Sequence, residues 1–374
     1  MLHDMPNNKI ITLFLALFLY PISVSAKQFQ PHSDLDINLY GVLDLSSKWE
    51  NSSHHQDSIK LDSGALSDSI FGLYGQYQLN SDTFIAAHLE SAVDIVHGKY
   101  IDEQHHFNQA AWLGLGHTTF GELRYGRQYS VGQEFISALE IGSWKDLGIG
   151  ALLRAADNYQ VPHQYSWHSP EISHIQIGIS YSPDIEIDTL FQSKNAQQYS
   201  FAARYVTDFI YLSSSFDIID KLNTTDFPKH KPQAIQFGMK YSPSAQQHFS
   251  GAWSRQKNGF VGLNAQEHAT HSIAIGSDAF LNHGYLDAFY LASAFALHTG
   301  ELKVQYSQAK AHFENSHPPT HKAKVMSVGY VYPYSEALQL YSYLAHSRNY
   351  SVDELWVDER STFTRLGFGI KYEF

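Results

Sequence analysis

The sequence predicts an all-β protein, an antiparallel β-barrel whose strands cross a membrane. After residue 34, apolar and polar residues alternate with a period of two in most segments, as in a strand with one apolar and one wet face. The connections between these segments alternate between short and long along almost the whole chain. The 374 residues include 24 Tyr and 23 Phe but no Cys. That composition is typical of a transmembrane barrel that crosses an oxidising compartment without disulfides.

The first residues have the pattern of a secretory signal peptide. An apolar run, 10–20, follows Lys9, and small residues precede a predicted cleavage site after Ala26. The run is shorter than the roughly 20 residues that a membrane-spanning helix needs. We therefore expect residues 1–26 to be removed and residues 27–374 to form one barrel domain.

The predicted strands follow one another without a long helical pattern between them. They are 35–49, 66–79, 83–96, 110–116, 120–128, 160–169, 172–182, 196–206, 209–218, 233–242, 246–256, 286–297, 301–312, 322–332, 337–348 and 361–374. We expect a 16-stranded barrel, which is wide enough to enclose a water-filled channel. A further strand at 268–277 would make an 18-stranded barrel the alternative.

The order of the connections favours a membrane barrel over a soluble sandwich. Tight turns such as 80–82 and 299–300 alternate with long loops such as 50–65, 183–195 and 313–321. In a meander of antiparallel strands, this order places all tight turns at one end and all long loops at the other. Outer-membrane barrels have this layout, and closure removes the sheet edges that lipid would not tolerate.

The third long connection, Tyr129–Gln160, combines charged, glycine and apolar residues in a stretch without strand periodicity. Its apolar content argues against full exposure to water, so we expect it to fold back into the barrel. Its acids would then face bases across a narrow gap. The candidate constriction acids are Glu134, Glu140 and Asp146, and the candidate basic residues of the pore wall are Arg124, Arg127 and Arg154. Such opposed charges in a lumen tune selectivity.

Two further acids, Glu90 and Asp94, are expected on the inner wall because they occupy the polar positions of an alternating segment. Arg124 and Arg127 have opposite parity. One of them should therefore point away from the lumen unless a β-bulge intervenes.

No motif in the chain indicates catalysis, a metal or another cofactor. The Gly-x-Ser-x-Gly elbow and the helical zinc motif are both absent from the sequence. The 22 histidines include the pairs His54-His55 and His105-His106, which we interpret as polar loop residues. Adjacent strand residues point to opposite faces and do not chelate together. The formal charge of −12 argues against nucleic acid as a partner.

Several short motifs resemble those of a known family. They are Phe71-Gly72-Leu73-Tyr74-Gly75, Ala111-Trp112-Leu113-Gly114-Leu115, Phe120-Gly121-Glu122-Leu123, Tyr125-Gly126-Arg127-Gln128 and the C-terminal Leu366–Phe374. In this order and spacing they resemble the general diffusion porins of Gram-negative bacteria. The resemblance covers nearly the whole mature chain.

The resemblance implies a trimeric outer-membrane barrel for passive diffusion of ions and small hydrophilic solutes, with the third loop narrowing the pore. Arg127 and Arg154 match basic wall positions, but the acidic loop tip usual in the family is absent here. The terminal Phe374 resembles the signal that the barrel assembly machinery reads. Membrane lipid and lipopolysaccharide would surround the barrel.

The acidic balance of the chain predicts a mild cation preference. A substrate-specific channel, for example for oligosaccharides, is the first alternative. An outer-membrane barrel enzyme is the second.

Overall fold

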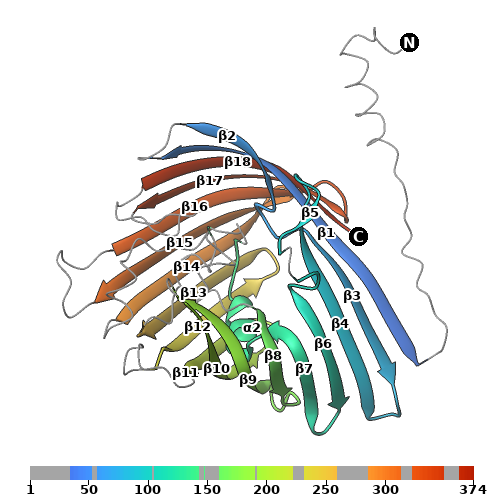
Figure 1. Cartoon of the computed structure of the whole chain (residues 1–374). Helices are drawn as coiled ribbons and strands as arrows, with labels where there is room; N and C mark the ends of the chain where they lie inside the picture. The colour runs from blue at the N-terminus through green and yellow to red at the C-terminus, as the bar shows by residue number, and fades with distance from the viewer. Residues whose placement is uncertain are drawn as a thin grey trace, which may run out of the picture.

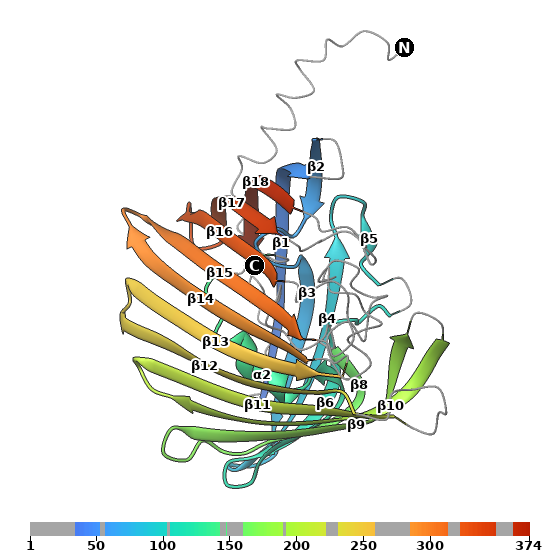
Figure 2. The same ribbon diagram turned by 90° about the vertical axis from the view of Figure 1, so that its left-hand side faces the viewer.

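The chain folds into a closed barrel of long antiparallel strands with a short helix inside it (Figures 1 and 2). The computed structural model describes residues 34–52, 57–102, 105–142, 147, 160–189, 192–221, 231–258, 285–312, 322–348 and 362–374. The sixteen long strands are β1 (Leu35–Ser52), β3 (Ile70–Gln78), β4 (Thr83–Asp94), β6 (Ala110–His117), β7 (Gly121–Tyr129), β8 (Gln160–His168), β9 (Ile175–Thr189), β10 (Gln192–Val206), β11 (Ile210–Lys221), β12 (Gln233–Ser244), β13 (Gln247–Lys257), β14 (Tyr285–Leu297), β15 (Gly300–His312), β16 (Lys322–Pro333), β17 (Leu338–Arg348) and β18 (Thr362–Glu373). The smaller elements are β2 (Ser58–Ser63), β5 (Lys99–Tyr100) and α2 (Val131–Ser137).

The first and last strands close the barrel. Strand β1 pairs with β18 from Val42 opposite Glu373 to Ser52 opposite Phe363. The backbone N–H of the terminal Phe374 donates to the carbonyl of Gly41 at 3.1 Å. The predicted sixteen-stranded barrel is therefore confirmed. The segment 268–277, which suggested eighteen strands, lies outside the described residues.

The two additional strands lie within predicted loops. Strand β2 pairs with the upper part of β1, and β5 pairs with the end of β4. Neither adds a member to the barrel wall, because β3 takes over the pairing with the lower part of β1.

One predicted loop, 183–195, is wrong, because β9 and β10 remain paired until Thr189 lies opposite Gln192. The predicted loop began at Pro183. The register shifts beside it: Ser182 lies opposite Gln198, whereas Ile185 lies opposite Ala196. Proline is tolerated at such a bulge because no ladder hydrogen bond requires its missing N–H.

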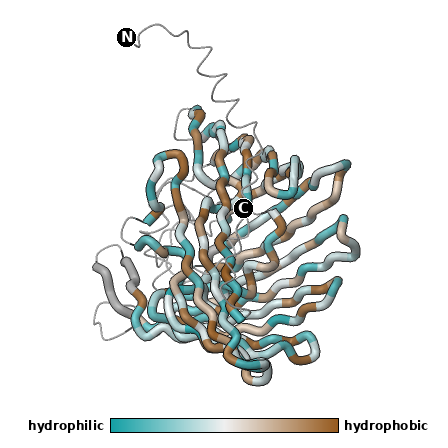
Figure 3. The backbone as a smooth tube through the Cα atoms, turned by 90° about the vertical axis from the view of Figure 1, so that its right-hand side faces the viewer, coloured by the Kyte–Doolittle hydropathy of each residue, from teal (hydrophilic) through white to brown (hydrophobic). Residues whose placement is uncertain are grey.

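The two faces of the wall differ in chemistry, as the alternating colours along the strands show (Figure 3). Large apolar side chains on the outer face are exposed, among them Leu113, Leu123, Leu291, Met326 and Phe368. Positions of the opposite parity are mostly small or polar, among them Ser200, Ser254, Ala288, Ala345 and Ser347. This arrangement suits lipid outside and water inside. Within the described part of the chain, no helix is both long and apolar enough to cross a bilayer.

Candidate pore constriction

Helix α2 begins the third loop immediately after β7 and lies inside the barrel (Figure 1). The Ser130 side chain caps the helix by accepting a hydrogen bond from the Gln133 N–H at 3.2 Å. Val131, Phe135, Ile136 and Leu139 are fully buried, so the apolar face of the loop is turned away from water. The expectation that this loop folds inward is confirmed.

Wall residues on successive strands hydrogen-bond the loop backbone. On β9 and β10, Ser180 and Ser200 accept from the N–H groups of Val131 and Gly132 at 3.3 and 2.9 Å. On β11 and β12, Tyr211 donates to the Phe135 carbonyl at 2.7 Å and Lys240 donates to the Ala138 carbonyl. These contacts satisfy backbone groups at both ends of the short helix, which its own ladder leaves without partners.

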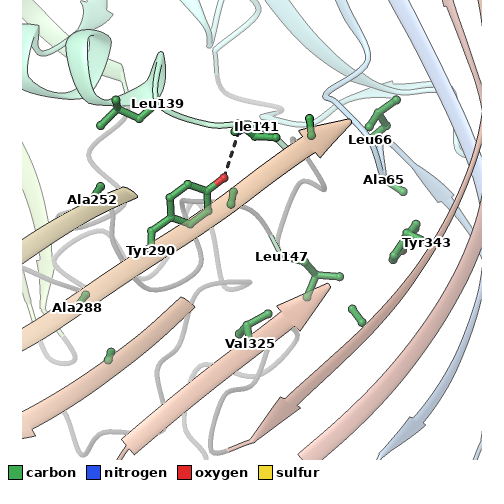
Figure 4. Packing of buried hydrophobic residues seen from close by; sticks show 14 of the residues in the cluster. Ala65, Leu66, Leu139, Ile141, Leu147, Ala252, Ala288, Tyr290, Val325 and Tyr343 are labelled. Atoms are coloured by element: carbon green, nitrogen blue, oxygen red, sulfur yellow. Dashed lines mark hydrogen bonds between the residues drawn. The ribbon is translucent and has the colours of Figure 1, made fainter. Parts of the chain in front are cut away.

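Wall residues also hydrogen-bond the part of the loop that follows the helix (Figure 4). The Tyr290 hydroxyl on β14 accepts from the Ile141 N–H at 3.1 Å and donates to the Gln305 side chain on β15 at 3.0 Å. The Gln305 amide in turn donates to the Leu147 carbonyl at 3.2 Å. The described part of the loop therefore follows the inner wall from β9 to β15 in chain order.

Glycines make room for the loop to lie this close. A Cβ on Gly238 of β12 would overlap the Leu139 side chain, and one on Gly178 of β9 would lie 2.9 Å from the Cβ of Val131. On the loop itself, a Cβ on Gly132 would lie 2.6 Å from a carboxylate oxygen of Asp217. A Cβ at these positions would force neighbouring atoms to shift, so glycine lets the loop and the wall approach each other here.

An acid–base cluster joins the helix to the strands that flank it. The Glu134 carboxylate lies 2.9 Å from His168 Nε2 on β8 and 3.7 Å from Arg124 Nη1 on β7. Arg124 also pairs with Glu122 at 2.7 Å. Burial opposes the ionisation of Glu134, but the hydrogen bond to His168 and the charges of Arg124 and Arg204 outweigh it. The pKa of Glu134 therefore lies below its usual value.

The other predicted residues of the third loop and its flanks contact other groups or lie outside the described residues. Glu140 follows the helix and interacts electrostatically with Lys240. Arg127 lies opposite Ala111 in the ladder, and its Nε donates to the Asn108 carbonyl at 2.6 Å. Asp146 and Arg154 lie outside the described residues.

The predicted inner-wall acids Glu90 and Asp94 have different surroundings. Glu90 accepts a hydrogen bond from Tyr40 and lies 3.9 Å from His88. Asp94 lies at the end of β4 and bonds the backbone and the side chain of His97. Glu90 therefore belongs to the lumen wall, whereas Asp94 organises the turn that follows its strand.

An aromatic cluster on β1, β3, β4 and β6 has no counterpart in the sequence prediction. The His88 ring lies 6.0 Å from Tyr74 and 5.7 Å from Trp112, centroid to centroid. Tyr40 hydrogen-bonds the same histidine at 2.6 Å. The Arg124 guanidinium lies over Trp112 at 4.6 Å, a cation–π geometry. Finding the cluster required the strand register, because its members are far apart in sequence.

Within the described residues, no group of three or more metal-ligating side chains converges. His105 bonds Asp102 at 2.7 Å, and His54 and His55 lie outside the described residues.

A closed barrel with an apolar outer face, a polar inner face and a loop folded along its lumen defines an outer-membrane channel. The family model described as Gram-negative porin matches residues 15–351. The chain therefore belongs to the Gram-negative porin family. Its function is that of an outer-membrane channel for passive diffusion.

Individual relatives agree with this assignment. An outer membrane porin protein of Bordetella pertussis is 21% identical over 362 residues, which are 92% of this chain and 91% of the relative. The anion-selective porin from Comamonas acidovorans has a similar structure, with a TM-score of 0.68, 18% identity and coverage of 91% of this chain and 100% of that one. OmpT of Vibrio cholerae in its trimer form matches with a TM-score of 0.61, 12% identity and coverage of 91% and 100%.

Proposed function

We propose that this channel is a general diffusion porin whose narrowest section lies between the third loop and the wall formed by β1 to β7. The Glu134–Arg124 contact of 3.7 Å carries the proposal, because it joins an acid of the loop to a base of that wall. Glu134 and Glu140 are the constriction acids, and Arg124 is the principal wall base. Opposed charges across a wet gap order water and disfavour apolar solutes.

A mild cation preference fits the pairing of lumen charges. Several inner-face bases have carboxylate partners close by. The pairs are Lys48–Asp62 at 2.7 Å, Arg124–Glu122 at 2.7 Å, Lys303–Glu301 at 3.2 Å and Arg365–Glu50 at 2.7 Å. Glu90 and Asp217 have hydroxyl partners, and Glu134 shares Arg124 with Glu122. The proposed preference rests on the formal charge of −12 of the whole chain, which favours cations.

We propose that the chain assembles as a homotrimer, by analogy with the trimer form of OmpT of Vibrio cholerae. We assign residues 1–26 to a cleaved signal peptide and Phe374 to recognition by the barrel assembly machinery. Lipopolysaccharide and membrane lipid surround the outer face. Arg127, Arg154 and Asp146 remain predicted pore residues, and catalytic activity is not part of the proposal.

A second candidate, a channel selective for oligosaccharides, is favoured by the aromatic cluster. Tyr74, His88 and Trp112 pack against one another edge to face on the inner wall. Sugar rings bind aromatic surfaces through their apolar faces and polar groups through their hydroxyls.

The two candidates are separated by sugar-induced block of the open channel. A general porin predicts that a linear hexasaccharide lowers the current only weakly and equally in the wild type and in Trp112→Ala. A saturable block in the wild type that Trp112→Ala abolishes would establish the sugar-selective channel instead. Reversal potentials in a salt gradient test the ion preference separately, and a value of the anion-selective sign would refute it.

A further inference from the structure

A basic patch lies on the outer face of the barrel, at one end of β13 to β17. The patch consists of Arg255, Lys257, Lys310, Lys322, Lys324 and Arg348. These five strands lie side by side (Figure 2). The parity of the strands assigns the patch to the lipid side. The same parity carries the exposed Phe289, Leu291 and Met326, whereas the opposite parity carries the buried Ala288, Ala309 and Ser347.

The strand register places the patch in three adjacent rows. Lys257 lies in the outermost row, opposite Tyr285. In the middle row, Arg255, Asp287, Lys310 and Lys322 lie opposite one another across four strands. In the next row, Lys324 lies directly opposite Arg348. Asp287 is the only acid at outward positions of the described parts of these strands. Its carboxylate is engaged by Arg255 at 2.7 and 2.8 Å.

Cations in these positions repel one another. Lys310 opposes Lys322 and Lys324 opposes Arg348, and like charges directly opposite each other destabilise a sheet. Within the described residues, no ion pair links Lys310, Lys324 or Arg348 to a carboxylate. An anion bound from outside the chain would relieve this repulsion.

The depth of the patch along the strands identifies the source of that anion. The patch lies at the end of the strands opposite the tight turns at 297–300 and 333–338. The next row inward carries Leu291 and Met326, which begin the apolar band. Lysine or arginine on the lipid face costs about 2–4 kcal/mol at the bilayer midplane but about 0–1 kcal/mol at the interface.

Aromatic rings beside the patch also indicate that it lies near the surface of the bilayer. The ring centroids of Tyr285 and Trp253 lie 4.7 and 5.7 Å from the Arg255 guanidinium carbon. Tyr285 also stacks on His312 with centroids 4.4 Å apart. Tyrosine and tryptophan gather where the apolar core of a bilayer meets its headgroups. The patch therefore lies at headgroup depth, at the end that carries the long loops.

We propose that this patch binds the phosphate groups of lipid headgroups in the outer leaflet. Lys310, Lys324 and Arg348 bind the phosphates, and the exposed apolar residues below them contact the acyl chains. Arginine and lysine form charge-assisted hydrogen bonds with phosphate oxygens. The inference rests on the outer-membrane location of the barrel and is independent of its ion preference.

The test is equilibrium binding of bisphosphorylated lipid A to the folded, detergent-solubilised protein. The triple variant Lys310→Gln/Lys324→Gln/Arg348→Gln is compared with the matched control Lys60→Gln/Lys99→Gln/Lys231→Gln. The control removes the same charge from exposed lysines elsewhere. Each surface cation contributes on the order of fivefold to the attraction of an anionic lipid. The patch variant should therefore bind more than about tenfold more weakly, and the control should bind like the wild type.

Further measurements complete the test. Dephosphorylated lipid A should bind the wild type as weakly as the patch variant binds the intact lipid. Inorganic phosphate at the concentration of the lipid should not displace it. The patch variant should keep its conductance and heat-modifiable gel mobility, because the altered side chains lie outside the lumen.

Three results would overturn the proposal. The first is equal lipid binding by the patch variant and the control. The second is displacement by dilute inorganic phosphate, which would indicate a site for small anions. The third is loss of the oligomer in the patch variant alone, which would make this face an interface between copies of the chain.

Discussion

Arg124 Nη1 lies 3.7 Å from the Glu134 carboxylate, which joins the barrel wall to the loop that narrows the lumen. The same guanidinium pairs with Glu122 and covers the ring of Trp112. One arginine therefore links the loop, the acidic wall and the aromatic cluster. Replacement of Arg124 or Glu134 should therefore change ion selectivity while the barrel remains folded.

Replacement of Glu134 by glutamine removes one negative charge from the constriction and keeps the size of the side chain. We expect a weaker cation preference, seen as a reversal potential closer to zero in a salt gradient. The control is Glu336→Gln, which removes a charge from an exposed turn. Equal reversal potentials for Glu134→Gln and the wild type would exclude Glu134 as a selectivity residue.

Replacement of Gly238 by valine should loosen the third loop. The new side chain would occupy the space of Leu139, and overpacking of this kind costs typically about 1–3 kcal/mol. We expect noisier channels that admit larger solutes, measured as open-channel noise and as exclusion size in liposome swelling. Gly75→Val is the matched control, because the nearest atom to a Cβ there is 3.9 Å away. Identical behaviour of both variants would argue against packing of the loop at Gly238.

Replacement of Tyr290 by phenylalanine leaves the Ile141 N–H and the Gln305 amide without their hydroxyl partner. A buried group left unsatisfied costs about 1–3 kcal/mol. The temperature at which the folded band unfolds on gels should fall. Tyr306→Phe removes a hydroxyl that bonds Gln308 on the outer face, and it should have a smaller effect. A larger fall in the unfolding temperature for Tyr306→Phe than for Tyr290→Phe would contradict this account.

If Glu134 is a constriction acid as proposed, ion selectivity at low pH should depend on its protonation. Its pKa lies below the usual value, so its stabilising contacts are present above the unfolded-state pKa and are lost as pH falls through the lowered folded value. The difference in cation preference between the wild type and Glu134→Gln should be constant from neutral pH down to about pH 4.3, the usual glutamate value, and shrink only below it. Comparison with Glu134→Gln removes the contribution of the other lumen acids. A difference that begins to shrink near pH 6 would contradict the lowered pKa.

Periodicity and loop length were sufficient to predict the barrel, because each strand must present an apolar face to lipid and a polar face to water. The inward loop was predictable because Phe135, Ile136 and Leu139 cannot remain exposed. The partners of these residues were not predictable, since Gly238 and Tyr290 are about a hundred residues or more away and only the register brings them to the loop. The bulge at Pro183 was missed because local sequence cannot distinguish a strand end from a tolerated irregularity.

The central claim is most directly tested by planar-bilayer recording of the refolded protein in a salt gradient. The account predicts stepwise openings in groups of three and a reversal potential of the cation-selective sign. An absence of conductance from protein shown to be folded by heat-modifiable gel mobility would contradict an open, water-filled pore.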